Sequence, residues 1–278
     1  MAVVWQCGRY ALPLKRPLVM GILNITPDSF SDGQQYLQPE AAILQAQRLI
    51  DEGADIIDIG AESTRPGAQT LSASDEVKRL MPVIEALLDC GLPLSVDTFK
   101  PSTMQHVLDA GVDIINDIYG FRQPGAVDVV AGYNCGLCVM HMQGEPRTMQ
   151  EAPHYNDVVA DVRHFLYQRT QELQQSGVVP NRIVLDPGFG FGKTAAHNYE
   201  LLKNFKQLHF EHYPWLVALS RKSMIGHITG REPAQRLGGS IAGALAGVVG
   251  GAKVLRVHDV AATVDAVKVW QRVFGEAP

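Results

Sequence analysis

The feature that most constrains the fold is a short apolar run that ends in polar side chains and recurs along the chain. Each run is rich in valine, isoleucine and leucine, and each is followed by a loop and a segment of helical periodicity. The eight runs are LVMGILNIT, DIIDIGAEST, LPLSVDTF, DIINDIYG, LCVMHMQ, RIVLDPG, LVALSRKS and KVLRVHD. Runs that are apolar on both faces are typical of buried parallel strands. The pattern predicts an α/β fold, a (β/α)8 TIM barrel, in which the carboxyl ends of the strands carry the functional groups.

The rest of the sequence favours one domain over residues 1–278. The length is close to the ~250 residues of a typical barrel of this kind, and we find no linker, low-complexity tract or change of composition. Residues 1–17 do not fit the repeat. There VVWQCG and RYALPL flank a glycine and predict a short N-terminal β-hairpin, which we expect to close the bottom of the barrel.

Composition argues against several classes of partner. The net charge is −5 and no basic stripe is present, so neither nucleic acid nor an anionic membrane is an expected partner. The N-terminus has no secretory signal pattern.

The longest uncharged stretch, residues 238–252, is shorter than the ~20 residues that span a bilayer, and its small residues favour a closely packed helix. The four cysteines include a lone CxxC, Cys135 and Cys138, which lacks the further ligands of a zinc site. We therefore expect a reducing, cytoplasmic location.

Four polar residues close separate predicted strands: Asp97, Asn116, Asp186 and Lys222. Charged groups are costly at the end of a buried strand unless they are paired, so an internal Asp–Lys ion pair is one interpretation. The other is a binding site for a flat heterocycle. Carboxylates accept two N–H donors from a guanidine-like edge, the amide both donates and accepts, and the ammonium donates to a carbonyl.

A second group, Ser220, Arg221, Arg256 and His258, follows the last two strands, where barrels of this class often bind phosphate. Arginine suits a bidentate phosphate contact, and we assign that role to Arg256 with His258. Arg221 is interpreted as a solvated charge. Asn24, at the end of the first strand, offers an oxygen to a hydrated Mg²⁺ ion.

The stretch DPGFGFGKT superficially resembles a nucleotide-binding loop. A P-loop requires a glycine separated by four residues from the Gly-Lys-Thr, and Pro187 stands at that position. We interpret the stretch as a glycine-rich turn that brings Phe189 or Phe191 to the wall of the pocket. The following helix is expected to begin near Asn198.

The two longest loops follow the first two strands, as NITPDSFSDGQQY and AESTRPGAQTLSAS. Loops of this length in a compact fold are usually functional lids or disordered segments. Because they follow barrel strands, we predict that they are lids over the mouth.

At these residues the chain resembles the dihydropteroate synthases of folate biosynthesis. The resemblance extends from Leu18 to Phe274 and rests on MGILNITPDSFSDG, GAESTRPGA, SVDT, INDI, HMQGEP, LDPGFGFGK, SRKSMIG and RVHD. Two small departures are Gln34 and Ala61, where the family often has glycine. Neither departure removes a polar group of the predicted site.

The resemblance implies a transferase that joins 6-hydroxymethyl-7,8-dihydropterin diphosphate to 4-aminobenzoate and releases diphosphate. The implied pterin-binding residues are Asp97, Asn116, Met140, Asp186, Phe191, Lys222 and Arg256. The implied diphosphate-binding residues are Asn24, Arg256 and His258, with Mg²⁺ at Asn24. The implied site for 4-aminobenzoate, which sulfonamides occupy, comprises Thr64, Arg65, Pro66, Phe30, Ser220 and Lys222. The implied catalytic residues are Asp97, Lys222, Arg256, Asp28 and Arg65.

The same resemblance implies a homodimer packed through the C-terminal helices. The residues also agree with a dissociative, SN1-like reaction, because Arg256, His258 and Mg²⁺ can stabilise a departing diphosphate. Three other functions are considered. They are a non-catalytic homologue that binds pterin, a methyltransferase that moves a methyl group from a reduced folate to a corrinoid, and an aldolase that forms a Schiff base at Lys222.

Overall fold

Eight parallel strands form a closed barrel in the computed structural model, which describes residues 3–25, 38–61, 71–146, 148–210 and 213–275. The strands are β3 (Leu18–Asn24), β4 (Ile56–Gly60), β5 (Leu94–Asp97), β6 (Ile114–Asp117), β7 (Gly136–Met140), β8 (Ile183–Asp186), β9 (Leu216–Val217) and β10 (Val254–Val257). Their hydrogen-bonded order is β8-β7-β6-β5-β4-β3-β10-β9. A parallel bridge between Leu185 and Trp215 joins the two ends of this order. The predicted (β/α)8 TIM barrel is confirmed.

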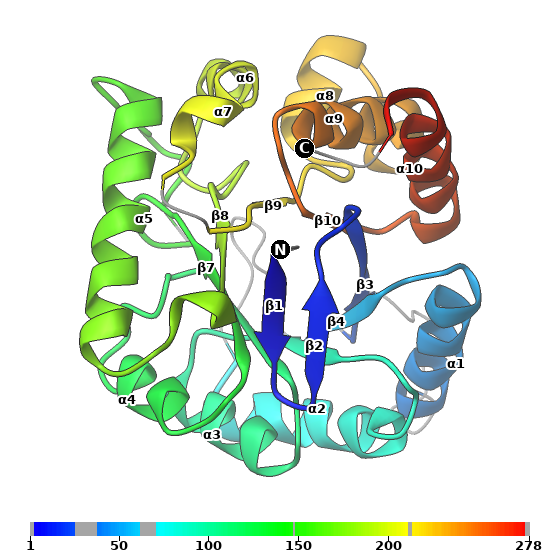
Figure 1. The fold of residues 1–278 in the computed structure, drawn as a ribbon, viewed down its shortest axis with the longest axis vertical. Coiled ribbons are helices and arrows are strands. Elements are labelled where there is room, and N and C mark those ends of the chain that lie inside the picture. The colour runs from blue at the N-terminus through cyan, green and yellow to red at the C-terminus, as the bar shows by residue number, and fades with distance from the viewer. Residues whose placement is uncertain (1–2, 26–37, 62–70, 147, 211–212, 276–278) are drawn as a thin grey trace.

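Helices surround the barrel, as Figure 1 shows. They are α1 (Gln38–Asp51), α2 (Ala73–Leu87), α3 (Pro101–Asp109), α4 (Ala126–Ala131), α5 (Val158–Gln175), α6 (Ala195–Lys203), α7 (Phe205–Leu208), α8 (Ser223–Thr229), α9 (Leu237–Val249) and α10 (Val260–Phe274), with short 3-10 turns at Pro180–Arg182 and Pro233–Gln235. None of the helices in the described ranges combines the length and the apolar character that a membrane crossing requires.

The small residues of α9 allow this helix to lie close to the barrel. A Cβ atom on Gly243 would lie 3.0 Å from a methyl group of Leu219, and one on Gly247 would lie 2.8 Å from a methyl group of Val217. The uncharged stretch at residues 238–252 is therefore mainly a packed helix, as predicted.

The strands alternate between the helix-facing and the inner side of the barrel, as the period of two along a strand requires. Ile57 and Ile59 of β4 belong to the apolar cluster between barrel and helices, whereas Ile56 belongs to the cluster inside the barrel. The same alternation in β6 places Ile115 outside and Ile114 inside. The polar residues that lie two positions beyond the inner isoleucines therefore face the barrel axis.

The N-terminal hairpin fills the lower end of the barrel, as predicted. Strands β1 (Val4–Cys7) and β2 (Tyr10–Pro13) pair in antiparallel fashion and lie across the middle of the ring of strands in Figure 1. Trp5 is fully buried beside residues near the strand starts, and its indole nitrogen donates to the Arg182 carbonyl oxygen at 2.9 Å. Gly136 is required here, because a Cβ atom would lie 2.7 Å from the Cys7 sulfur. With this end filled, the opposite end is the one open to a ligand.

Candidate active site

The barrel register brings the predicted strand-end residues to one level. Asn24 is paired with Gly60, Gly60 with Asp97, and Asp97 with Asn116, across four neighbouring strands. Met140 of β7 is likewise paired with Asp186 of β8. Side chains from distant parts of the sequence therefore meet at the carboxyl ends of the strands, where barrels of this kind carry their chemistry.

Asp58 is the centre of the polar network, and the sequence analysis missed it. Its carboxylate accepts from Arg256 Nε at 2.6 Å, from Asn116 Nδ2 at 3.2 Å and from Ser95 Oγ at 2.5 Å. Arg256 also donates through Nη2 to Asp97 Oδ2 at 2.9 Å. The sequence did contain a signal, because Asp58 is a charged residue between two isoleucines in a buried strand.

Asp97 shares the charge of Arg256 with Asp58, and this sharing affects its ionisation. Burial raises the pKa of Asp97 to about 7, and the negative charge of Asp58 raises it too, whereas Arg256 opposes the rise. The Asp97 side chain nevertheless retains 15% of its exposure. A carboxyl group that is partly exposed and titrates near neutral pH is well suited to contact a ligand.

Lys222 and Asp186 form the other side of the network. The Lys222 ammonium donates to the Phe189 carbonyl oxygen and lies 4.7 Å from the centre of the Phe191 ring. Burial lowers the pKa of Lys222 to about 8, and Asp186 opposes this shift. Burial also raises the pKa of Asp186, whose Oδ1 accepts from the Gly188 amide at 2.7 Å. Among the described residues, no ion pair joins Lys222 to Asp97 or Asp186, which argues against the alternative interpretation of an internal Asp–Lys pair.

The two phenylalanines of the glycine-rich turn point to different places. Phe189 is fully buried and stacks on Phe205 at 6.4 Å between ring centres, on the outer side of the barrel. Phe191 is half-buried and packs against a cluster at the mouth. This mouth cluster consists of Ile118, Tyr119, Met140, Met142 and Met149 with Phe99 and Phe191. Of the two predicted alternatives, Phe191 is the wall residue, and the cluster offers aromatic and thioether groups to a flat ring.

Ser220 and His258 face each other on the anion side of the mouth. Ser220 Oγ accepts from the His258 backbone amide at 3.2 Å and lies 3.0 Å from His258 Nδ1. Burial and the nearby Arg256 lower the pKa of His258 to about 4, so the ring is neutral at pH 7. In the Ser220–His258 contact either group can be the donor, depending on which nitrogen of the neutral ring carries the proton.

Arg221 is held away from this pair by an ion pair of its own. Its Nε donates to Asp259 Oδ2 at 3.1 Å, and its side chain is 37% exposed. The interpretation of Arg221 as simply solvated is therefore incomplete. Its backbone has a φ of 59°, a strained conformation for a residue other than glycine, and such strain is common beside functional sites.

Five predicted residues lie outside the described ranges, namely Asp28, Phe30, Thr64, Arg65 and Pro66. The described part of the chain contains no group of three histidine, cysteine or acidic side chains able to hold a metal ion. Cys135 and Cys138 are buried, free thiols. Asn24 is exposed at the end of β3.

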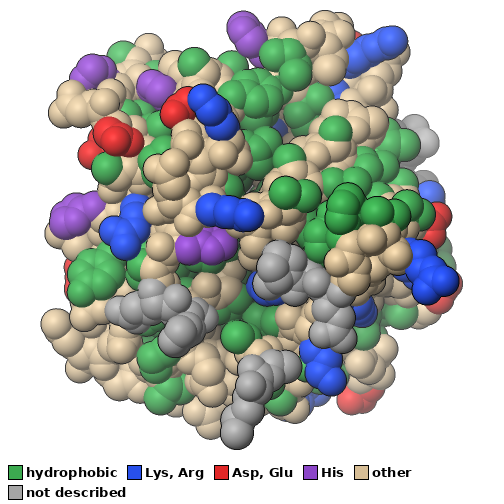
Figure 2. Space-filling model, turned by 45° about the horizontal axis from the view of Figure 1, so that its top comes forward, with side chains coloured by type: hydrophobic (Ala, Val, Ile, Leu, Met, Phe, Trp, Pro, Cys, Tyr) green, Lys and Arg blue, Asp and Glu red, His purple; other side chains and the backbone are tan. Residues whose placement is uncertain are grey.

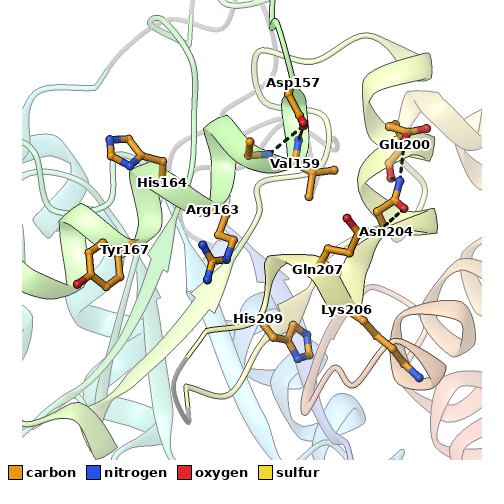
Figure 3. A pocket seen from close by; sticks show the side chains of 11 residues that line it. Asp157, Val159, Arg163, His164, Tyr167, Glu200, Asn204, Lys206, Gln207 and His209 are labelled. Carbon is orange, nitrogen blue, oxygen red and sulfur yellow. Dashed lines mark hydrogen bonds between the residues drawn. The ribbon is translucent and has the colours of Figure 1, made fainter.

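A separate groove lies on the outside of the barrel, between α5 and the α6–α7 segment (Figure 3). It has a volume of about 570 Å³ and is lined by polar side chains that include Asp157, Arg163, Asn204 and His209. None of the predicted site residues lines it. The groove and the mouth are therefore different places on the molecule.

Comparison with known proteins agrees with this geometry. A family model described as pterin binding enzyme matches residues 20–258. A dihydropteroate synthase of Neisseria meningitidis serogroup C is 48% identical over 273 residues, which are 96% of each chain. A Burkholderia cenocepacia dihydropteroate synthase complexed with 7,8-dihydropteroate superposes with a TM-score of 0.90 at 50% identity, covering 98% of this chain and 96% of that one. A Xanthomonas albilineans dihydropteroate synthase with 4-aminobenzoic acid gives 0.93 at 49% identity, covering 98% of each. From its fold, its strand-end residues and these matches, the chain belongs to the dihydropteroate synthase family of pterin-binding enzymes.

Proposed function

We propose that this protein is a dihydropteroate synthase. It joins (7,8-dihydropterin-6-yl)methyl diphosphate to 4-aminobenzoate and yields 7,8-dihydropteroate and diphosphate. The observation that carries the proposal is the network of Asp58, Asp97 and Arg256 at the open end of a barrel. This barrel superposes over nearly its full length on one relative with dihydropteroate and another with 4-aminobenzoic acid.

The deep part of the mouth suits the pterin ring. The carboxylates of Asp97 and Asp186 accept N–H donors from the ring, Asn116 contributes an amide, and Lys222 donates to the ring carbonyl. Met140 and Phe191, both in or against the mouth cluster, pack on the faces of the ring. Each group thus has a partner of matching chemistry on a flat, polar-edged heterocycle.

The anion side suits the diphosphate. Arg256 and His258 are proposed to donate to the departing diphosphate, and such preorganised donors stabilise a transition state more than a ground state. In the proposed dissociative step the bond between the pterin methylene carbon and the diphosphate oxygen breaks, and its electron pair leaves with diphosphate. The ring delocalises the resulting cation, and the Asp97 carboxylate stabilises it. The amine nitrogen then bonds to the methylene carbon and loses a proton.

Mg²⁺ is part of the proposal, and Asn24 fits it. The ion prefers oxygen ligands and usually keeps several waters while it binds substrate phosphates, so a single exposed amide oxygen next to a diphosphate site is sufficient. When bound, Mg²⁺ would neutralise charge on the leaving diphosphate. Asn24 would hold the ion at the level of Asp97, since both residues pair with Gly60.

The 4-aminobenzoate site is proposed to lie above the pterin, beside Ser220 and Lys222. The predicted partners Phe30, Thr64, Arg65 and Pro66 lie outside the described ranges and remain predictions. Sulfonamides, which are analogues of 4-aminobenzoate, should compete for this site. An aromatic amine is a modest nucleophile, so its positioning beside the methylene carbon accounts for much of the expected acceleration.

A homodimer packed through the C-terminal helices is also proposed. Figure 2 shows hydrophobic side chains gathered on the face that carries α8, α9 and α10. Three of the exposed ones lie on α10, with Val269 66%, Val273 65% and Phe274 68% exposed. Sedimentation velocity should give twice the mass of one chain, and replacing Val269 and Val273 by glutamate should give a monomer. A wild-type monomer at micromolar concentration would contradict the proposal.

A cytoplasmic location also remains a proposal, in keeping with the four free cysteines.

The function is tested by mass spectrometry of the products. The protein is incubated with the pterin diphosphate, 4-aminobenzoate and Mg²⁺, and parallel samples omit one component each. Dihydropteroate in the complete mixture alone supports the synthase. Diphosphate release without 4-aminobenzoate would further support the dissociative step. Pterin binding without any product would instead favour the non-catalytic homologue.

The proposal predicts a narrow pH optimum. The profile of kcat/KM reports groups of the free enzyme. Asp97, with a pKa of about 7, is a carboxylate only above that pH, and Lys222, with a pKa of about 8, is an ammonium only below that pH. We therefore expect kcat/KM to be greatest between about pH 7 and 8 and to fall on both sides. A kcat/KM profile that stays flat from roughly two pH units below this window to one pH unit above it would contradict the placement of both groups in the site.

A further inference from the structure

Lys193 is a buried lysine close to the mouth that the proposed reaction does not use. It is 3% exposed and lies just after the glycine-rich turn. Its ammonium lies 2.8 Å from His141 Nδ1, 2.9 Å from the Gly188 carbonyl oxygen and 3.0 Å from the Phe191 carbonyl oxygen. Burial lowers the pKa of Lys193 well below the usual range of a lysine, and Asp186 opposes this shift. Whether as an ammonium with three N–H donors or as an amine with two donors and one acceptor, the nitrogen has a partner for each of its hydrogen-bonding positions. A buried lysine with this arrangement is a built feature of the fold, since an unpaired charge there would be costly.

The three acceptors of Lys193 come from the two loops that form one wall of the site. His141 follows β7, and its backbone amide donates to the Asp186 carbonyl oxygen at 3.0 Å. Gly188 and Phe191 belong to the turn that follows β8. Lys193 therefore links the residue that follows β7 to two points of the loop that follows β8.

The glycine-rich turn has little freedom to take another path. Gly188 has a φ of +68°, and a Cβ atom there would lie 1.8 Å from the His141 carbonyl oxygen. Gly192 has a φ of +61°, and its Cβ atom would lie 2.5 Å from the Gln143 carbonyl oxygen. The turn is thus pressed against the preceding loop, and Lys193 is the polar group that holds it from inside.

The glycine-rich turn also positions Lys222. The Phe189 carbonyl oxygen accepts from the Lys222 ammonium, and the Phe191 ring lies 4.7 Å from it. Lys193 thus acts on Lys222 through the loop between them.

We propose that Lys193 is a positioning residue for the pterin site. Its ammonium, held by His141 and two carbonyl oxygens, fixes the turn that carries Phe191 and orients Lys222. The assignment rests on the proposed function, which it deepens by naming a residue behind the binding wall.

The charge of Lys193 has a second effect, on Asp186. The groups that face Asp186 are Lys222, Arg256, Lys193 and the Cys138 thiol. All three cations lower the pKa of Asp186, against the rise that burial causes. His141 is neutral, because burial and the Lys193 charge lower its pKa well below the usual range. The hydrogen bonds of Lys193, rather than its charge, carry the proposed positioning role, because burial also lowers the pKa of Lys193 well below its usual range.

The test compares Lys193→Met with Lys203→Met, since Lys203 is an exposed lysine on the neighbouring helix α6. Circular dichroism first establishes that each variant folds. Calorimetry with the pterin diphosphate should then give an affinity roughly 10- to 100-fold weaker for Lys193→Met, as expected when a supporting contact of a ligand group is lost. The KM for this substrate should rise more than kcat falls. Lys203→Met should match the wild type.

Lys193→Gln keeps neutral N–H donors and provides the second variant if Lys193→Met does not fold. It should weaken pterin binding less than methionine does. Wild-type pterin affinity and an unchanged KM in a folded variant would overturn the proposal. Failure of both variants to fold would overturn it too, because Lys193 would then support the barrel rather than the site. Calorimetry does not depend on turnover, so wild-type binding without product would count against the synthase and not against Lys193.

Discussion

Replacement of Arg256 by alanine is expected to reduce kcat/KM by roughly 10²- to 10³-fold, the usual loss when a preorganised donor to a developing oxyanion is removed. Arg256 has two tasks in this account. It donates to Asp58 and Asp97, at 2.6 Å and 2.9 Å, and it supplies the cation beside the proposed diphosphate. Its removal therefore leaves two carboxylates uncompensated and the leaving group without its main counter-charge. Steady-state kinetics with the pterin diphosphate as the varied substrate measures this loss.

A matched control for this variant is Arg16→Ala. Arg16 also contacts an aspartate through two nitrogens, at 2.8 Å and 2.5 Å to Asp55. This pair lies before the first residues of β3 and β4, at the filled end of the barrel, and the arginine is 44% exposed. Its removal should leave kcat/KM unchanged. Near-normal kinetics in Arg256→Ala, or an equal loss in both variants, would take Arg256 out of the site.

Asp58→Asn is expected to lower both the stability and the activity. The Asp58 carboxylate is fully buried and accepts from three side chains. Removing one partner of a buried ion pair typically costs about 3–5 kcal/mol of folding free energy, because it leaves the other charge uncompensated. Here Asp97 still contacts Arg256, so the lower part of that range is expected. Urea unfolding measures the change, and kinetics below the unfolding transition should show weaker binding of the pterin diphosphate.

The control for this variant is Asp55→Asn, which breaks the more exposed Arg16–Asp55 pair. Exposed pairs contribute roughly 0–1 kcal/mol, so the free energy of unfolding should change by about 1 kcal/mol or less. If the two asparagine variants unfold at the same urea concentration, Asp58 is not the centre of the network.

Much of the architecture could be predicted because it depends on local patterns. A parallel barrel strand is apolar on both faces and ends at a loop, so the eight strands could be recognised from their composition alone. The alternation of side chains then carried Asp97, Asn116 and Asp186 to the inner face at the strand ends. The hairpin was predictable for the same reason, since two short strands flank a glycine.

The missed features depend on the closed barrel. Asp58 meets Arg256 across 198 residues of sequence, and no local pattern announces that contact. Whether Phe189 or Phe191 reaches the mouth depends on the left-handed φ angles at Gly188, Gly190 and Gly192. A smaller error was local. Helix α6 begins at Ala195 rather than near Asn198, because a capping box between Thr194 and His197 starts it earlier.

The most direct test of the central claim is a crystal structure of the protein with a dihydropterin bound. The account predicts that the ring lies at the carboxyl ends of the strands, with its N–H edge on Asp97 and Asp186 and its carbonyl toward Lys222. Met140 and Phe191 should contact its faces. A ring bound elsewhere, such as the outer groove between α5 and α7 (Figure 3), with the strand-end residues untouched, would contradict the assignment of the site.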